Sequence, residues 1–232
     1  MLTIDRLNQS YGQSHTLRDL DLEVPEGECT CVMGRNGVGK TTLMKAIMGE
    51  VAVSSGSIRY RGDIELTRRS IEERSRLGIG YVPQGRQIFP LLTVEENLRT
   101  GLAARGDGSR RIPERIHELF PVLDEMKHRR GGDLSGGQQQ QLAIGRALVI
   151  EPRLLILDEP GEGIQPNIVA QIGEVIRRLI REDGLTVLLV EQKLPFARRF
   201  ADRFVIMDRG SPVAGGGIDA LSDALIREHL TV

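Results

Sequence analysis

The stretch ECTCVMGRNGVGKTTLMKAIM, residues 28–48, decides the fold of this chain. Its first six residues have the composition of a buried strand, and KTTLMKAIM has the pattern of a helix. Between them, Gly34, Gly39, Lys40 and Thr41 fit the phosphate-loop pattern G-x-x-x-x-G-K-[ST]. Because this pattern lies after a strand and at the start of a helix, we predict an α/β fold with a phosphate site.

The residue types of this loop explain the prediction. Glycines let the backbone curl so that successive N–H groups face phosphate oxygens, while Lys40 neutralises phosphate charge and the Thr41 hydroxyl ligates Mg²⁺. We therefore expect a nucleoside triphosphate with Mg²⁺ as the ligand. The predicted nucleotide-binding residues are Gly34, Arg35, Asn36, Gly37, Val38, Gly39, Lys40, Thr41 and Thr42.

Two adjacent acidic residues follow a second apolar run, LLIL at 154–157. A phosphate loop needs a carboxylate that positions the metal at the end of a neighbouring strand, and Asp158 fits this role. Glu159, one residue further, is predicted to polarise the attacking water as general base. The alternative for Glu159 is a residue that only ends the strand.

The remaining pattern divides the chain into an N-terminal β part, a mostly parallel core and a helical insertion. Alternating runs at 2–7, 18–24 and 57–60 predict an antiparallel sheet, and apolar runs at 154–157, 186–190 and 204–207 predict buried parallel strands. From about 86 to 135 only helical patterns occur, at 94–105 and 113–123. We expect a catalytic core over 1–85 and 136–232, with a helical subdomain at about 86–135.

Composition excludes several classes of protein. The 232 residues include 31 basic and 32 acidic side chains, and the arginines are scattered, so nucleic-acid binding is disfavoured. Cys29 and Cys31 lie two apart in a strand, which favours buried reduced thiols over a disulfide. No secretory signal and no apolar stretch of roughly 18 residues occurs, so we expect a cytoplasmic protein that does not itself enter a membrane.

A third motif, LSGGQ at 134–138, identifies a family resemblance. Together with the phosphate loop and LLILDEP, it resembles the nucleotide-binding domain of ATP-binding-cassette (ABC) proteins, essentially from end to end. The resemblance implies a P-loop NTPase fold, ATP hydrolysis and a head-to-tail dimer. In such a dimer, Ser135, Gly136, Gly137 and Gln138 contact the nucleotide of the other subunit. A helix beginning at these residues is also a suitable anion site.

The resemblance extends to single residues. Tyr11 in NQSYG is similar to the aromatic residue that stacks on adenine, although an ordinary strand aromatic is the alternative. Gln84 in YVPQGR is similar to the Q-loop glutamine, which contacts Mg²⁺ or the attacking water and links the site to the helical subdomain. Gln192 stands where the family has its switch histidine, and Gln165 where it has the D-loop aspartate. We expect Gln192 to act in catalysis without the charge of an imidazolium.

The segments VEQ and EGIQP resemble importers of the branched-chain amino-acid type. The sequences of the motifs taken together most resemble the second ATPase subunit of the urea-importing branch. Gly161 departs from the threonine usual there. The resemblance implies transmembrane permease subunits, a paralogous ATPase or a second copy, and an external substrate-binding protein. The expected location is the cytoplasmic face of the cell membrane, and the cargo is urea, a short amide or a branched-chain amino acid.

Two other functions remain open from sequence. One is a soluble cassette ATPase that acts on a protein or nucleic-acid complex. The other is a regulatory module without hydrolysis, which the intact Lys40, Asp158 and Glu159 disfavour.

Overall fold

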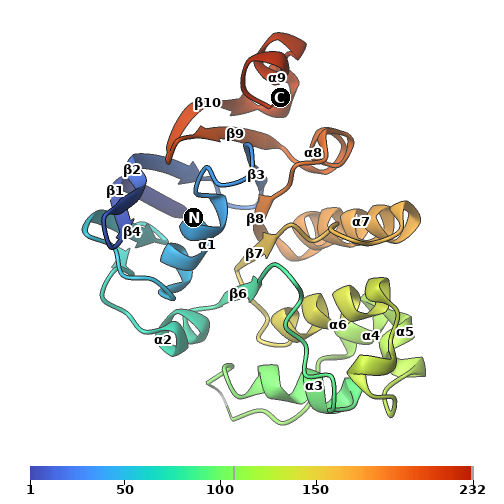
Figure 1. Cartoon of the computed structure of the whole chain (residues 1–232). Helices are drawn as coiled ribbons and strands as arrows, with labels where there is room; N and C mark the ends of the chain where they lie inside the picture. The colour runs from blue at the N-terminus through green and yellow to red at the C-terminus, as the bar shows by residue number, and fades with distance from the viewer. Residues whose placement is uncertain (107, 231–232) are drawn as a thin grey trace.

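Two β-sheets with one helix between them form the frame of the protein (Figure 1). The computed structural model describes residues 1–106 and 108–230. The helix between the sheets is α1 (Lys40–Met48), which begins at the end of the phosphate loop. Its apolar side chains belong to a core cluster that joins the N-terminal strands to one face of the larger sheet. The predicted α/β fold is confirmed.

The N-terminal sheet is antiparallel, as the alternating pattern predicts. Its strand order is β2-β1-β4-β5. The strands are β1 (Leu2–Tyr11), β2 (Ser14–Val24), β4 (Ser55–Tyr60) and β5 (Ile64–Glu65). Alternate residues Leu20, Leu22 and Val24 of β2 are buried, so this sheet presents an apolar face to the α1 cluster.

The larger sheet has the order β10-β9-β3-β8-β7-β6 and is parallel except for β10. Its central strands are buried on both faces, which explains their continuous apolar sequences. The strands are β3 (Cys29–Met33), β6 (Ile79–Val82), β7 (Leu154–Asp158), β8 (Thr186–Val190), β9 (Arg203–Asp208) and β10 (Ser211–Gly217).

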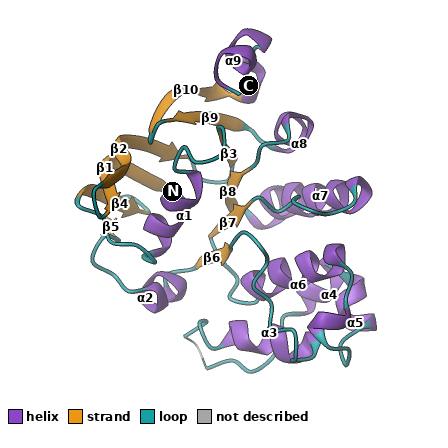
Figure 2. Cartoon of the chain, viewed as in Figure 1, coloured by secondary structure: helices purple, strands orange, loops and turns teal. Residues whose placement is uncertain are grey.

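Helices cover the second face of this sheet (Figure 2). They are α6 (Gly136–Leu148), α7 (Pro166–Asp183) and α8 (Leu194–Phe200). Cys29 and Cys31 pack on this side, whereas Val32 packs toward α1. Both thiols are free and fully buried, as predicted, and burial raises the pKa of Cys29 to about 12.

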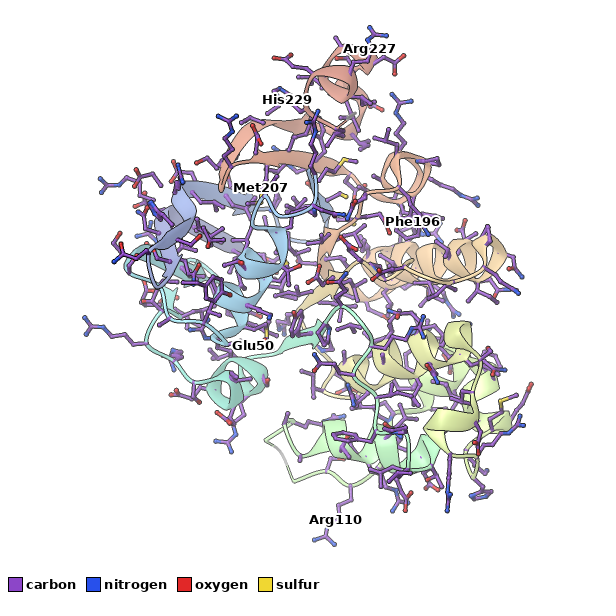
Figure 3. The ribbon with its side chains drawn as sticks, in the orientation of Figure 1. Glu50, Arg110, Phe196, Met207, Arg227 and His229 are labelled. Atoms are coloured by element: carbon purple, nitrogen blue, oxygen red, sulfur yellow. The ribbon has the colours of Figure 1, made fainter. Side chains whose placement is uncertain are left out.

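The helical part contains α3 (Val94–Leu102), α4 (Glu114–Leu119) and α5 (Pro121–Glu125), and α3 and α5 pack against α6. The single helix predicted at 113–123 is wrong, because the chain leaves the helical conformation at Phe120. Pro121 lacks an N–H and disfavours a helical residue before it. The polar segment before α4 extends Arg110 into solvent (Figure 3).

The remaining helices are α2 (Ile71–Arg76), α9 (Asp223–His229) and 3₁₀ turns at Gly131–Asp133 and Ile218–Ala220. Helix α2 has a structural task. Its Arg74 is 2% exposed and donates from Nη1 to the carbonyl oxygens of Ala46 and Ile47, both at 2.7 Å. These carbonyls belong to the last turn of α1, so Arg74 caps the C-terminal end of the helix that follows the phosphate loop.

Candidate nucleotide and hydrolysis site

Four loops meet at the carboxyl edge of the larger sheet. They follow β3, β8, β7 and β6, which are neighbours in that order. This edge is where ligands bind in open α/β sheets. A cleft of about 690 Å³ opens there. It is lined by Thr16, Asn36, Gly37, Gly39, Lys40, Thr41, Thr42, Gln84, Glu159, Glu162, Gly163, Glu191, Gln192 and Lys193.

Two glycines of the phosphate loop leave no room for a side chain. Gly34 has φ +147°, and a Cβ atom there would lie 2.5 Å from the carbonyl oxygen of Met207 on β9. Gly39 has φ +108°, and its Cβ atom would lie 3.0 Å from Leu17 on β2. Residues other than glycine rarely adopt such backbone conformations. The loop is therefore packed tightly between two strands of different sheets.

The ammonium of Lys40 lies inside this loop. The residue is 5% exposed, and its Nζ donates to the carbonyl oxygens of Gly34 at 2.8 Å and Arg35 at 2.9 Å. Burial lowers the pKa of Lys40, and the charges of Glu159 and Asp158 act in the opposite direction. A buried cation is thus held at the centre of the loop by neutral oxygens.

Asp158 ends β7 with a buried carboxylate that lacks partners. The residue is 1% exposed, and neither of its oxygens accepts a hydrogen bond within residues 1–106 and 108–230. Burial raises its pKa to about 6. The Thr41 hydroxyl, which lies close but without the geometry of a hydrogen bond, acts in the opposite direction, as does the charge of Lys40.

These features fit a divalent cation. The two unpartnered oxygens of Asp158 are hard ligands beside the Thr41 hydroxyl. Among the described residues, three or more His, Cys, Asp or Glu side chains nowhere gather into a metal site. Mg²⁺ held with a nucleotide needs only one or two protein ligands, because phosphates and waters complete its shell. Asp158 and Thr41 therefore suit Mg²⁺ with a nucleotide, and do not suit an all-protein metal cage.

Two glutamine amides fix the carboxylate of Glu159. Gln192 donates from Nε2 to Oε1, and Gln84 donates from Nε2 to Oε2 at 3.3 Å. The same Nε2 of Gln84 also donates to Glu162 at 3.0 Å, and that of Gln192 to Asn36 at 2.8 Å. Glu159 itself has φ 50°, a conformation that costs a non-glycine residue about 1–3 kcal/mol. The backbone and both amides thus hold this carboxylate at the cleft.

Sequence reasoning missed a second set of groups in the cleft. Glu191 is 3% exposed, and its Oε1 accepts from the backbone N–H groups of Gln192 at 2.8 Å and Lys193 at 2.9 Å. Its Oε2 is buried without a partner among the described residues, beside the position that a Cβ atom on Gly161 would take. Lys193 donates from Nζ to the Gly161 carbonyl at 2.6 Å. The signal available was an acidic residue directly after the buried strand β8.

The LSGGQ residues Ser135, Gly136, Gly137 and Gln138, called the signature residues below, lie at the start of α6, which is called the signature helix. Ser135 caps α6, where its Oγ accepts from the Gln138 N–H at 3.4 Å while the Gln138 side chain accepts from the Ser135 N–H at 2.9 Å. Gly136 and Gly137 open the helix, as predicted. None of these four residues lines the cleft.

The structure brings together most of the predicted site residues. Lys40, Thr41, Gln84, Glu159 and Gln192 line one cleft. Four further residues of the phosphate loop and the start of α1 line it as well, namely Asn36, Gly37, Gly39 and Thr42. Gly34, Arg35 and Val38 belong to the same loop without lining the cleft, and Asp158 lies beneath it. Tyr11 is 49% exposed at the end of β1 and does not line the cleft.

Comparison with known proteins identifies the family. The sequence matches the ABC transporter family over residues 17–162, more than half of the chain. The chain belongs to the ABC transporter family. The cassette is 44% identical to BraG, a high-affinity branched-chain amino acid transport ATP-binding protein of Pseudomonas aeruginosa, over 90% of each chain. It is 37% identical to LivF, a probable branched-chain amino acid transport ATP-binding protein of Archaeoglobus fulgidus, over 95% of this chain and 94% of the relative.

Solved structures agree with this assignment. A nucleotide-free ATP-binding cassette from an ABC transporter superposes with a TM-score of 0.84 at 25% identity, covering 98% of this chain and 94% of the other. A dimeric cassette in a post-hydrolysis state, bound to ADP and phosphate, gives 0.84 at 27% identity, covering 94% and 99%. The cassette described here is accordingly an ATPase that binds ATP. Within its described residues, each helix is too short or too polar to cross a membrane.

Proposed function

We propose that this cassette is the ATPase subunit of a membrane importer and that its cargo is a branched-chain amino acid. The observation that carries the proposal is the near full-length similarity, 44% and 37% identity, to two proteins named for branched-chain amino acid transport. Urea is the second candidate, favoured by the resemblance of the motif sequences as a whole to the urea-importing branch. The cassette does not itself select cargo in this proposal, since permease and binding protein do so.

The nucleotide phosphates bind in the loop after β3. Lys40 exchanges its two carbonyl partners for phosphate oxygens, and residues 34–42 supply backbone N–H groups. Thr41 and Asp158 would hold Mg²⁺, with Gln84 as a further ligand through its amide oxygen, and the ion when bound would supply neutralisation of charge on the phosphates. Support comes from the unpartnered carboxylate of Asp158 beside Thr41. Adenine stacks on Tyr11 in this proposal, as the family resemblance implies; the side chain is exposed at the end of β1, outside the lining of the cleft.

Hydrolysis uses Glu159 as general base. A base must be held within hydrogen-bond reach of its water, and the two glutamine amides orient both oxygens of this carboxylate toward the cleft. Gln84 and Gln192 therefore act as positioning residues for Glu159. Gln192 can also donate to a γ-phosphate oxygen, although it brings no positive charge.

Two cassettes work as a head-to-tail dimer in this proposal. Ser135, Gly136, Gly137 and Gln138 begin a helix outside their own cleft, which suits contact with the nucleotide of the opposite subunit. The second subunit is a paralogous ATPase or another copy of this chain. ATP then acts as the contact between subunits, and hydrolysis releases them.

The permease docks beside Gln84. Phe89 and Leu91, which follow Gln84 in sequence, are 47% and 79% exposed, and such apolar side chains favour a protein partner. This position places the cassette peripherally on the cytoplasmic face of the membrane, with the helical subdomain at about 86–135 next to the permease. A substrate-binding protein on the outer side completes the importer, and nucleic acid has no role.

The test is uptake by membranes containing the neighbouring permease subunits and a binding protein. Wild-type cassette should support ATP-dependent uptake of labelled leucine, and Glu159→Gln should abolish it while retaining ATP binding, with hydrolysis reduced by roughly two to three orders of magnitude. Uptake of urea instead would keep the importer and replace the cargo. Absence of any membrane partner would favour a soluble cassette ATPase, and unchanged turnover of Glu159→Gln would contradict the base assignment.

A further inference from the structure

Arg86 occupies an unusual backbone position between the cleft and α6. Arg86 and the next residue, Gln87, have φ values of 69° and 47°, and consecutive left-handed residues other than glycine are unfavourable unless contacts hold them. Arg146 of α6 supplies such contacts. Its Nη2 donates to the carbonyl oxygens of Gln87 at 2.8 Å and Arg86 at 3.4 Å. The loop after β6 is thus fastened to the helix that begins with the signature residues.

The side chain of Arg86 contacts two further segments. Its Nη1 donates to Oε1 of Gln139 in the first turn of α6 at 3.1 Å, and its Nη2 donates to the carbonyl oxygen of Glu162 at 3.4 Å. A Cβ atom on Gly136 would lie 3.3 Å from both Nη atoms. One guanidinium therefore joins the loop of Gln84, the loop of Glu159 and the start of the signature helix.

The surroundings of this guanidinium favour a nearby anion. Both of its acceptors are neutral oxygens, and it lies beside the first residue of α6, at the positive end of a helix of 13 residues. A cation at this end is unfavourable by itself and is favoured by a nearby anion. In the proposed dimer, that anion is the triphosphate held by the opposite subunit.

The same segments carry the hydrolytic residues. Gln84, two positions before Arg86, donates to the carboxylates of both Glu159 and Glu162, while the backbone carbonyl of Glu162 accepts from Arg86. A displacement of Gln84 when nucleotide binds would therefore be passed to Arg86 and Gln139. These contacts form one continuous set of hydrogen bonds between a cassette's own cleft and the surface it presents to its partner.

We infer that Arg86 is a positioning residue that couples the two nucleotide sites of the dimer. Its hydrogen bonds make the position of α6, which faces the opposite subunit, depend on whether nucleotide occupies the cleft of its own subunit. The inference rests on the head-to-tail dimer proposed above. Its consequence is that removal of Arg86 weakens cooperativity between sites more than it weakens nucleotide binding to one cassette.

The experiment compares wild type with Arg86→Met, Arg86→Lys, Gln139→Leu and the double variant Arg86→Met/Gln139→Leu. Arg99→Met is the matched control, because Arg99 pairs with Glu95 on the surface of α3. Three quantities are measured: affinity for a fluorescent ATP analogue at protein concentrations that keep the cassette monomeric, kcat, and the Hill coefficient for ATP hydrolysis. Dimer formation with ATP is followed by size exclusion in a Glu159→Gln background, and folding by circular dichroism.

For Arg86→Met we expect monomer affinity within about threefold of wild type, kcat reduced about tenfold or more, and a Hill coefficient near one. Arg86→Lys should behave alike, because an ammonium cannot bridge two acceptors in the plane of a guanidinium. The double variant should be no worse than Arg86→Met alone, since contacting residues are not additive.

A Hill coefficient equal to wild type in both Arg86 variants, or strictly additive losses in the double variant, would overturn the coupling role. If wild type shows neither cooperativity nor an ATP-dependent dimer, a dimer of two copies of this chain is itself wrong, and the inference falls with it. The two failures are thus distinguished by the behaviour of the unmutated protein.

Discussion

The Nε2 group of Gln192 donates to Oε1 of Glu159 and, at 2.8 Å, to Oδ1 of Asn36 in the phosphate loop. One neutral amide thereby links the end of β8 to the loops after β7 and β3. A histidine at this position would change charge near neutral pH, whereas an amide does not. The orientation of Glu159 is therefore independent of any proton on residue 192.

This contact gives a kinetic prediction for Gln192. Gln192→Leu should lower kcat about tenfold to a hundredfold with the KM for ATP within about threefold, because it removes a donor that orients the base but leaves the phosphate loop intact. Gln192→Glu should lower kcat further, since a second carboxylate would repel Glu159. Steady-state ATPase assays check both, with Gln171→Leu on the exposed side of α7 as control. A loss below threefold in Gln192→Leu would contradict the positioning role.

A second prediction concerns stability and pH at Asp158. Burial raises its pKa from 3.8 to about 6 in the folded protein. The folded state thus binds more protons than the unfolded state between about pH 4 and pH 6. The contribution of Asp158 to stability is complete below this window and is lost as pH rises through about 6.

Asp158→Asn should therefore stabilise the nucleotide-free protein at pH 7.5 by about 2–3 kcal/mol, the free energy that corresponds to raising the pKa of this carboxyl from 3.8 to about 6. The difference from wild type should shrink toward pH 5, and ATPase activity should be lost. Urea denaturation at both pH values measures this, with Glu125→Gln as an exposed carboxylate control. An Asn variant less stable than wild type at pH 7.5 would show that the ionised carboxylate does not lower the free energy of unfolding.

Gly161 offers a third prediction, because it lies beside the unpartnered Oε2 of Glu191. A Cβ atom at residue 161 would lie 3.1 Å from that oxygen and 3.3 Å from Val169, so a small side chain fits after a minor adjustment. A serine would also bring a hydroxyl donor to a buried carboxylate oxygen that has none within the described part of the chain. Burial raises the pKa of Glu191, and the new donor should lower it.

We expect Gly161→Ser to be about 1 kcal/mol more stable than Gly161→Ala at neutral pH. Chemical denaturation of both variants measures the difference, and the alanine variant accounts for the loss of glycine flexibility in the unfolded chain. The advantage of serine should disappear in a Glu191→Leu background. If it persists there, the hydroxyl has another partner.

A fourth prediction tests the capping of α1 by Arg74. Arg74→Met should destabilise the protein by about 2–3 kcal/mol, because two carbonyls at the end of α1 and that of Arg69 lose a buried donor. Arg76→Met, two residues further and exposed, should change stability by less than about 0.5 kcal/mol. Equal unfolding curves for the two variants would contradict this role.

The sequence predicted those parts of the molecule that local pattern determines. Strands such as 154–157 and 186–190 are continuous apolar runs because both of their faces are buried, and the loop from Gly34 to Thr41 has a fixed spacing. Loops following neighbouring parallel strands necessarily meet, so the grouping of Lys40, Gln84 and Glu159 was also predictable. The break at Phe120 was missed although Pro121 marks it.

Contacts between distant loops were not predictable. Nothing in the spacing of Glu162 or Arg86 indicates what these side chains contact, because their partners lie more than 50 residues away in the sequence. The position of Tyr11 relative to the cleft was not predictable either; the residue lies exposed at the end of β1, outside the lining of the cleft, and its stacking on adenine stays a prediction.

Lys40, finally, has a second role that follows from its two hydrogen bonds to Gly34 and Arg35. These two hydrogen bonds hold the loop in its folded conformation before the nucleotide binds, so the chain loses little conformational entropy on association. Binding is then an exchange of partners around one nitrogen. A substitution at Lys40 therefore loosens the free loop as well as weakening the bound state, and the affinity it removes overstates the contribution of the charge alone.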